Sequence, residues 1–304
     1  MYATYFFMLQ LEFQTFFVTA ERPQLGLCST VIAGVTNIIL DVLFMAVLRW
    51  GIVGAALATA LSEFVGGIVP VIYFSRENTS LLRLQKFSFD GKALLKACIN
   101  GSSELMSNIS MSLVGILYNL QLLKYAGENG IAAYGVLMYV NFVFISMFIG
   151  YIVGTAPVIS YHFGAENHSE LKSLLRKSIV IISSFAVVML ILAQVLAKPI
   201  AQIFVGYDKE LMAMTLRGFR VFSFSFLFAG FAIFSSGFFT ALNDGLTSAI
   251  ISFLRTLVFQ IAAVMILPLI WKLDGIWISV VFAEVMAVIL AVSFIVAKQK
   301  KYKY

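Results

Sequence analysis

The chain has 304 residues, of which 61% are hydrophobic and only 12% are charged, and its formal net charge is +6. About 25% of the residues of a soluble globular domain are charged, so this composition excludes that class. The mean hydropathy of +0.96 indicates a chain that lies in a bilayer. The positive charge lies mostly in loops and in the C-terminal tail, which points to membrane orientation and excludes nucleic acid as the expected partner.

Long apolar stretches follow one another along the whole chain. A membrane-spanning helix needs about 20 mostly apolar residues. About nine stretches qualify: 1–19, 24–48, 52–74, 94–124, 129–160, 173–197, 209–241, 247–270 and 275–297. The breaks between them carry Gly, Pro, Asn and Asp, which favour turns. The predicted fold class is therefore all-α, a polytopic membrane helix bundle of about nine spans.

One long polar connection divides the predicted bundle. We expect three spans in 1–74, a cytoplasmic inter-lobe loop in 75–93, and six spans with a basic tail in 94–304. Basic residues favour the cytoplasmic side of a membrane. The basic segment 172–177 and the lysines of the tail therefore predict a cytoplasmic C-terminus.

An internal repeat relates the two parts. The segment 17–63 aligns with 238–284 at a constant offset of 221 residues, which pairs Gly54 with Gly275 and Glu63 with Glu284. Internal repeats of spans are typical of transporters. The same offset places the counterparts of three spans before Met1, so we expect two pseudo-symmetric lobes, a partial first lobe and a complete six-helix second lobe. A natural nine-span chain is the alternative.

Polar residues form one face of the stretch 97–124, which otherwise reads as a membrane helix. They are Asn100, Glu104, Asn108, Ser112 and Asn119. The first four recur every four residues, so they share a helix face. A carboxylate in hydrocarbon is costly, so Glu104 should face the bundle interior or a water-filled cavity. The face is either the wall of a substrate or cation pathway or a set of hydrogen bonds between helices.

Further ionisable residues fall inside the predicted spans. They are Asp41, Glu63, Arg255 and Glu284. Glu104, Arg255 and Glu284 are expected at comparable depths, so Arg255 could pair with Glu284 or with Glu104. The first pair would be a structural ion pair.

The span 129–160 supplies candidates for a substrate cavity, namely Tyr134, Tyr139 and Asn141, together with Phe142, Phe144 and Phe148. Such residues could line a cavity for large, flat cations, or they could face lipid or the core. No cofactor or metal site is expected, because His162 and His168 share one loop and Cys28 and Cys98 lie in apolar segments. No enzymatic activity is expected either, because an intramembrane enzyme would need a metal-ligand set or a nucleophile–base pair within the spans.

Several short stretches, taken in order with the repeat and the central loop, resemble the multidrug and toxic compound extrusion (MATE) family of bacterial type. They are 37–41 (NIILD), 54–59 (GAALAT), 132–135 (AAYG) and 275–279 (GIWIS), the last leading to Glu284. The resemblance implies two six-helix lobes, alternating access, and export of organic cations by antiport with H⁺ or Na⁺. In sodium-coupled relatives an acid of the seventh helix serves the cation site, and Glu104 stands at the matching place.

The chain departs from the family pattern at two acids. The first-helix aspartate of some relatives has no counterpart in this sequence, and the span that matches the tenth helix, 209–241, carries no intramembrane acid. A lipid-linked oligosaccharide flippase of the same superfamily and a non-transporting remnant stay open as alternatives. The expected partners are small organic cations and the lipid bilayer, and the expected state is a monomeric transporter in the plasma membrane.

Overall fold

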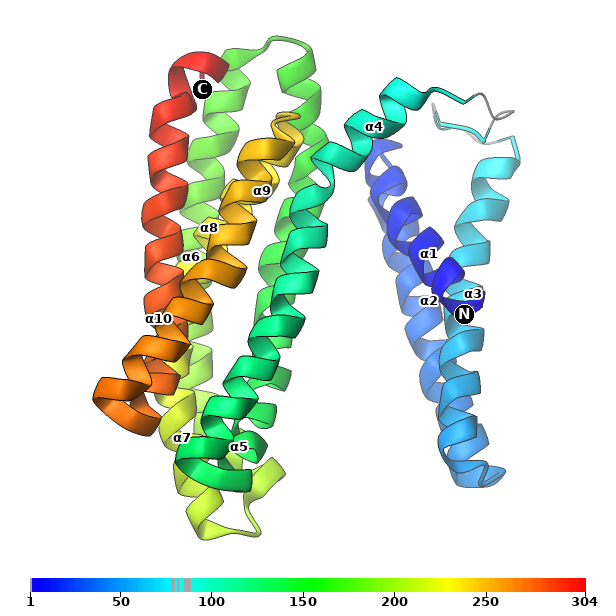
Figure 1. Ribbon diagram of the computed structural model, residues 1–304. Helices are drawn as coiled ribbons and strands as arrows, with labels where there is room; N and C mark the ends of the chain where they lie inside the picture. The colour runs from blue at the N-terminus through cyan, green and yellow to red at the C-terminus, as the bar shows by residue number, and fades with distance from the viewer. Residues whose placement is uncertain (1, 78–79, 81, 85–88) are drawn as a thin grey trace. The chain divides into compact units, whose positions relative to one another are not determined.

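The structure, a computed structural model, describes residues 2–77, 80, 82–84 and 89–304. Its regular structure over these ranges is helical throughout (Figure 1), which confirms the predicted all-α fold class. The chain forms two compact units, Met1–Phe89 and Asp90–Tyr304, and each is described by itself. The lobe boundaries predicted around the central loop stay predictions.

The first unit contains α1 (Tyr2–Thr19), α2 (Pro23–Asp41) with a π-helical turn (Val42–Val47), and α3 (Gly51–Ser75). Small residues let α1 and α3 approach closely. A Cβ atom on Gly67 of α3 would lie 2.6 Å from the backbone oxygen of Phe6. Phe13, Phe17 and Phe74 form an aromatic cluster where the same two helices meet. Close contact between small residues is a usual way to pack helices in lipid.

The second unit holds the longer helices. They are α4 (Gly91–Asn100), α5 (Ser102–Gly164), α6 (His168–Val205), α7 (Lys209–Phe222) with a 3₁₀ turn (Ser223–Ser225), α8 (Phe226–Ala241), α9 (Gly245–Phe253) with a π-helical turn (Leu254–Phe259), and α10 (Gln260–Tyr302). The backbone leaves the helical region inside α5 at Gly127 (φ 64°, ψ −154°) and inside α10 at Lys272 (φ 50°, ψ −127°). Helices α5 and α10 therefore each consist of two helices. Both breaks lie at turns that the sequence predicts. Because α5 extends to Gly164, His162 lies in its last turn and not in a loop.

Six helical segments of the described chain have the length and composition to cross a membrane. They are Pro23–Val47, Gly51–Ser75, Glu104–Gly164, His168–Val205, Lys209–Ala241 and Gly245–Tyr302. Two of the six contain the breaks just described. The count of nine spans stays a prediction.

The helix expected over 94–124 is divided near its start. α4 ends at Asn100, Gly101 forms a turn, and α5 begins at Ser102 (Figure 1). Asp90 starts α4, because its carboxylate accepts hydrogen bonds from the backbone N–H groups of Lys92 and Ala93. The bend lies at Gly101, and glycine is a residue type that weakens a helix interior.

A seam of hydroxyl groups joins α8 to α9. Ser236 Oγ lies 2.9 Å from Ser248 Oγ and 2.7 Å from Ser252 Oγ, and Thr240 Oγ1 lies 2.7 Å from Ser248 Oγ. The three serines are buried. The seam satisfies polar groups inside a segment that is otherwise apolar.

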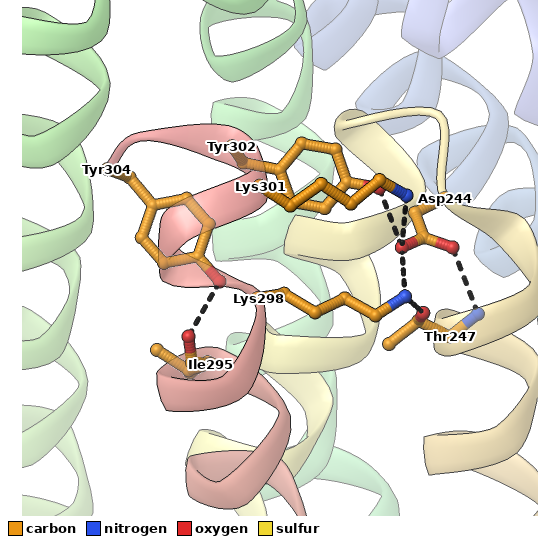
Figure 2. A network of polar contacts seen from close by, with 7 residues as sticks. All are labelled: Asp244, Thr247, Ile295, Lys298, Lys301, Tyr302 and Tyr304. Carbon is orange, nitrogen blue, oxygen red and sulfur yellow. Dashed lines mark hydrogen bonds and ion pairs between the residues drawn. The ribbon is translucent and has the colours of Figure 1, made fainter.

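The end of α10 is fastened to the turn between α8 and α9 (Figure 2). Asp244 accepts hydrogen bonds from Lys298 Nζ (2.6 Å) and from the hydroxyl group of Tyr302 (2.7 Å). Lys298 also donates to Thr247, and the Tyr304 hydroxyl donates to the backbone oxygen of Ile295. Residues 295–304 and the α8–α9 turn thus form one polar cluster, called the tail network below.

Candidate functional site

Helix α5 carries two stripes of residues on opposite faces. Ser110, Val114, Tyr118 and Leu122 recur every four residues and are buried in the second unit. The predicted polar residues Glu104, Asn108, Ser112 and Asn119 are exposed. Glu104, Asn108 and Ser112 are two residues out of register with the buried stripe, which is about 200° around a helix, whereas Asn119 follows Tyr118 by one residue and lies about 100° from it. The polar stripe therefore faces away from the core of its own unit.

The hydrogen bonds of the polar stripe stay almost entirely within its own helix. Asn108 Nδ2 donates to the backbone oxygen of Glu104 (2.8 Å), and Ser112 Oγ donates to that of Asn108 (3.3 Å). The Glu104 carboxylate and the Asn119 side chain make no hydrogen bond with any residue that the structure describes. In the described chain, α5 thus presents a free carboxylate and free amide oxygens to its surroundings.

Asn100 differs from the rest of the stripe, because it belongs to α4 and contacts another helix. Its Nδ2 donates to the backbone oxygen of Thr240 (3.1 Å). Its Oδ1 is buried without a hydrogen-bond partner among the described residues. A Cβ atom on Gly245 would lie 2.5 Å from the Asn100 Cα, so the two backbones touch. Of the five predicted residues, Asn100 is the one that joins helices.

Glu104 and Arg255 lie at different distances along their helices from one shared contact. The contact of Asn100 with Gly245 brings the end of α4 level with the start of α9. At about 1.5 Å per residue, Glu104 lies about 6 Å beyond that level and Arg255 about 15 Å beyond it. The bend at Gly101 causes the difference, because it shortens the helix that carries Glu104.

Arg255 is paired with Glu284. Its Nε and one terminal nitrogen donate to the two carboxylate oxygens at 2.9 and 2.8 Å, which is a bidentate pair. The side chains are 16% and 6% exposed, respectively. The sequence leaves Glu284 and Glu104 open as partners of Arg255, and in the structure the partner is Glu284.

An uncharged polar cluster lies deeper in the same unit, and sequence reasoning overlooked it. The Tyr118 hydroxyl donates to Gln260 Oε1 (2.8 Å) and lies 2.7 Å from Ser279 Oγ. These residues are 142 and 161 positions away from Tyr118 in sequence. The sequence signal for this cluster is Gln260, a polar residue inside an apolar span.

The aromatic cavity candidates do not form one group. Tyr134 is buried and stacks on Tyr118 (ring centroids 5.3 Å apart), whereas Tyr139 is 71% exposed and stacks on Phe204. Asn141 is half-buried. Phe144 and Phe148 are buried in the core, and Phe142 is exposed. Helical periodicity separates them, since residues two or five positions apart point to different sides.

Two acids of the first unit are half-buried. Asp41 ends α2, and Glu63 lies in the middle of α3. Neither makes an ion pair or a side-chain hydrogen bond with a described residue. The repeat pairs Glu63 with Glu284, but the position that matches Arg255 is Gly34, which carries no side chain. The buried pair thus has no counterpart at that place in the first unit.

Comparison with known families decides the classification. The MatE family profile matches residues 105–266, which is more than half of the chain. The chain belongs to the MatE family. The match begins one residue after Glu104 and covers α5 to the first part of α10, so it includes most of the polar stripe, the hydroxyl seam and Arg255.

Two curated relatives of this MatE chain are multidrug export proteins named MepA. The MepA of Staphylococcus haemolyticus (strain JCSC1435) is 28% identical over 291 residues, which is 95% of this chain and 63% of the relative. The MepA of Staphylococcus saprophyticus is 25% identical and covers 90% of this chain and 58% of the relative. The MatE chain thus spans about 60% of the length of these relatives.

Solved structures show the same fold. A multidrug resistance MATE family transporter of the MOP superfamily, in an outward-facing conformation, superposes with a TM-score of 0.86 at 22% identity. That match covers 93% of this chain and 64% of the other. A MOP superfamily transporter from Pyrococcus furiosus superposes with a TM-score of 0.86 at 23% identity over the same shares. At identities of 22% and 23%, the likeness shows only that the fold is the same.

Proposed function

We propose that the protein is a secondary active transporter that exports organic cations and drugs by antiport with H⁺ or Na⁺ through alternating access. The MatE fold and the multidrug export function of the MepA relatives support this class. The proposal includes a monomeric protein in the plasma membrane with a cytoplasmic C-terminus. It needs no cofactor apart from the coupling ion.

The polar stripe of α5 is the observation that carries the proposal. A set of residues that only joins helices should donate and accept across helices, whereas Glu104, Asn108 and Ser112 do neither in the described chain. A carboxylate in a membrane segment is costly, and such residues usually mark a substrate or ion pathway. We assign Glu104 to hold the coupling proton or cation, with the amide oxygens of Asn108 and Asn119 as neutral neighbours and Asn100 fixing the adjacent helix end.

Exchange of Glu104 for glutamine tests this assignment, because it keeps the size of the side chain and removes the charge. We expect Glu104→Gln to abolish coupled ethidium efflux in the natural full-length protein, with membrane insertion unchanged. The matched control is Glu128→Gln, the same change at an exposed turn residue near Gly127, and it should keep efflux. Unchanged efflux in Glu104→Gln would disprove the assignment.

A further inference from the structure

An exposed cationic face near the start of α6 lies outside every site discussed so far. Ser169, Lys172, Ser173, Arg176 and Lys177 line an open hollow of about 670 Å³. These residues recur three or four positions apart, so they share one side of the helix. Three cations are thus gathered within about two turns.

The positive charge of this face is not neutralised within the described chain. Lys172, Arg176 and Lys177 are exposed and make no ion pair or hydrogen bond with a described residue. Glu170 is the acid of the same first turns, and it also forms no ion pair with them. The face therefore has an excess of positive charge that favours an anionic ligand.

The length of the uncharged part of α6 indicates where this face lies relative to the hydrocarbon core of a membrane. Residues 178–197 contain no charged residue and are followed by Lys198. At about 1.5 Å per residue this stretch is about 30 Å long, which matches the hydrocarbon core of a bilayer. Lys177 thus stands at the boundary between headgroups and hydrocarbon, with Lys172 and Arg176 among the headgroups.

The hollow continues into the apolar segment. Val180 and Ile181 complete its lining and are exposed on the same side of α6, one turn beyond the cations. A free phosphate ion would use the cationic part alone. An anionic phospholipid would use both parts, its phosphate on the cations and its first acyl methylenes on the apolar side chains.

We propose that this face binds an anionic phospholipid. Lys172, Arg176 and Lys177 hold the phosphate group, and the hydroxyl groups of Ser169 and Ser173 donate to its oxygens. Val180 and Ile181 pack against the start of the acyl chains. Anionic lipids of the cytoplasmic leaflet attract basic segments beside the membrane, by roughly 1 kcal/mol or about fivefold in affinity per cation. The proposal does not depend on what the protein transports.

Native mass spectrometry of the detergent-purified protein, titrated with phosphatidylglycerol or phosphatidylcholine, tests the proposal. We expect preferential binding of phosphatidylglycerol, weakened at least tenfold in Lys172→Gln/Arg176→Gln/Lys177→Gln. The matched control Lys124→Gln/Lys198→Gln/Lys209→Gln removes three exposed cations elsewhere and should bind like the wild type. If the triple variant does not fold, Arg176→Gln should still weaken binding about fivefold.

Three results would overturn the proposal. The first is equal binding of the two lipids by the wild type. The second is unchanged phosphatidylglycerol binding in the folded variants. The third is displacement of the lipid by millimolar inorganic phosphate, which would make the face a simple anion site.

Discussion

At the scale of single residues, the pair of Arg255 and Glu284 has the largest expected effect on stability. Both side chains are largely buried and joined by two hydrogen bonds. Taking two charges out of water is costly, so the pair itself adds little to the free energy of unfolding. Losing one partner is different, because it leaves a buried charge alone.

We therefore expect Arg255→Met to lower the free energy of unfolding by about 3–5 kcal/mol, and Arg255→Met/Glu284→Leu to restore most of it. Thermal unfolding of the purified protein measures both. The control is Arg217→Gln, because Arg217 and its partner Asp274 are 68% and 35% exposed. That pair should contribute less than about 1 kcal/mol. Equal losses in Arg255→Met and Arg217→Gln would contradict the expectation.

The sequence alone indicates which residues share a helix face, but it does not indicate which distant residues they contact. The spacing of Glu104, Asn108 and Asn119 is a local property, so their common face could be predicted. The pairing of Tyr118 with Gln260 joins residues far apart in the chain and depends on how α5 and α10 pack. No local pattern contains that information.

At the scale of helices, the hairpin around Lys272 depends on a missing side chain. A Cβ atom on Gly275 would lie 2.4 Å from the backbone oxygen of Leu267. Backbone atoms cannot swing aside as a flexible side chain does. Glycine at this position thus permits the two parts of α10 to meet.

Gly275→Ala should destabilise the protein by about 1–3 kcal/mol, because the hairpin must open to admit the methyl group. The control is Gly150→Ala in α5, where an added Cβ atom has no neighbour within 4 Å. Alanine is the better helix former, so this change should be neutral or slightly stabilising. Melting temperatures compare the two variants. An unchanged melting temperature for Gly275→Ala would show that the hairpin can accommodate the methyl group.

The tail network should be insensitive to pH until strongly acidic conditions. Burial alone would raise the pKa of Asp244, but hydrogen bonds from Lys298, Tyr302 and Thr247 lower it to about 2. The ordinary value is about 3.9. The ionised carboxylate therefore stabilises the fold above about pH 4, by on the order of 2 kcal/mol, and this contribution is lost as the pH falls toward 2.

Asp244→Asn should remove this contribution at neutral pH. We expect amide hydrogen exchange in residues 295–304 to become roughly tenfold faster or more, whereas wild-type protection relative to intrinsic exchange should agree at pH 7 and pH 5. Lys300→Gln, an exposed tail cation, is the control and should exchange like the wild type. Unchanged exchange in Asp244→Asn would mean that Asp244 does not fasten the tail.

The positions of helix ends were predictable where turn residues mark them, as at Gly127 and near Lys272. The bend at Gly101 was not, because isolated glycines are tolerated in membrane helices. The contact of Gly245 with Asn100 places this bend against α9, and that contact comes from packing. The tail network could not be predicted, because the contacts of Asp244 with Lys298 and Tyr302 join residues far apart in the chain and depend on packing.

At the scale of the whole molecule, the repeat can be followed in the backbone of both units. Gly51 and Lys272 are equivalent positions and both have a positive φ, of 57° and 50°. Gly54 and Gly275 each lie against the backbone of the preceding helical segment. Phe17 and Phe238 are both buried. These shared features support the duplication, which rested on few identities in the sequence.

The membrane topology gives a prediction at this scale. Phe163 contacts Tyr302, with ring centroids 5.7 Å apart, so the loop before α6 and the tail share one end of the second unit. Tyr207 lies beyond the other end of α6, a helix of 38 residues or about 57 Å. In a protein without Cys28 and Cys98, Asn167→Cys should react with an impermeant maleimide from the cytoplasmic side and Tyr207→Cys from outside. Labelling of both from one side would contradict the topology.

The hydroxyl seam between α8 and α9 has a consequence for the direction of its hydrogen bonds. Each of its hydroxyl groups can donate or accept, so the direction of the whole chain of hydrogen bonds can reverse by rotation about C–O bonds, with no heavy atom displaced. Ser236 already faces two partners that lie one helical turn apart, Ser248 and Ser252. The seam can therefore reverse its hydrogen bonds while the packing of α8 on α9 stays as it is.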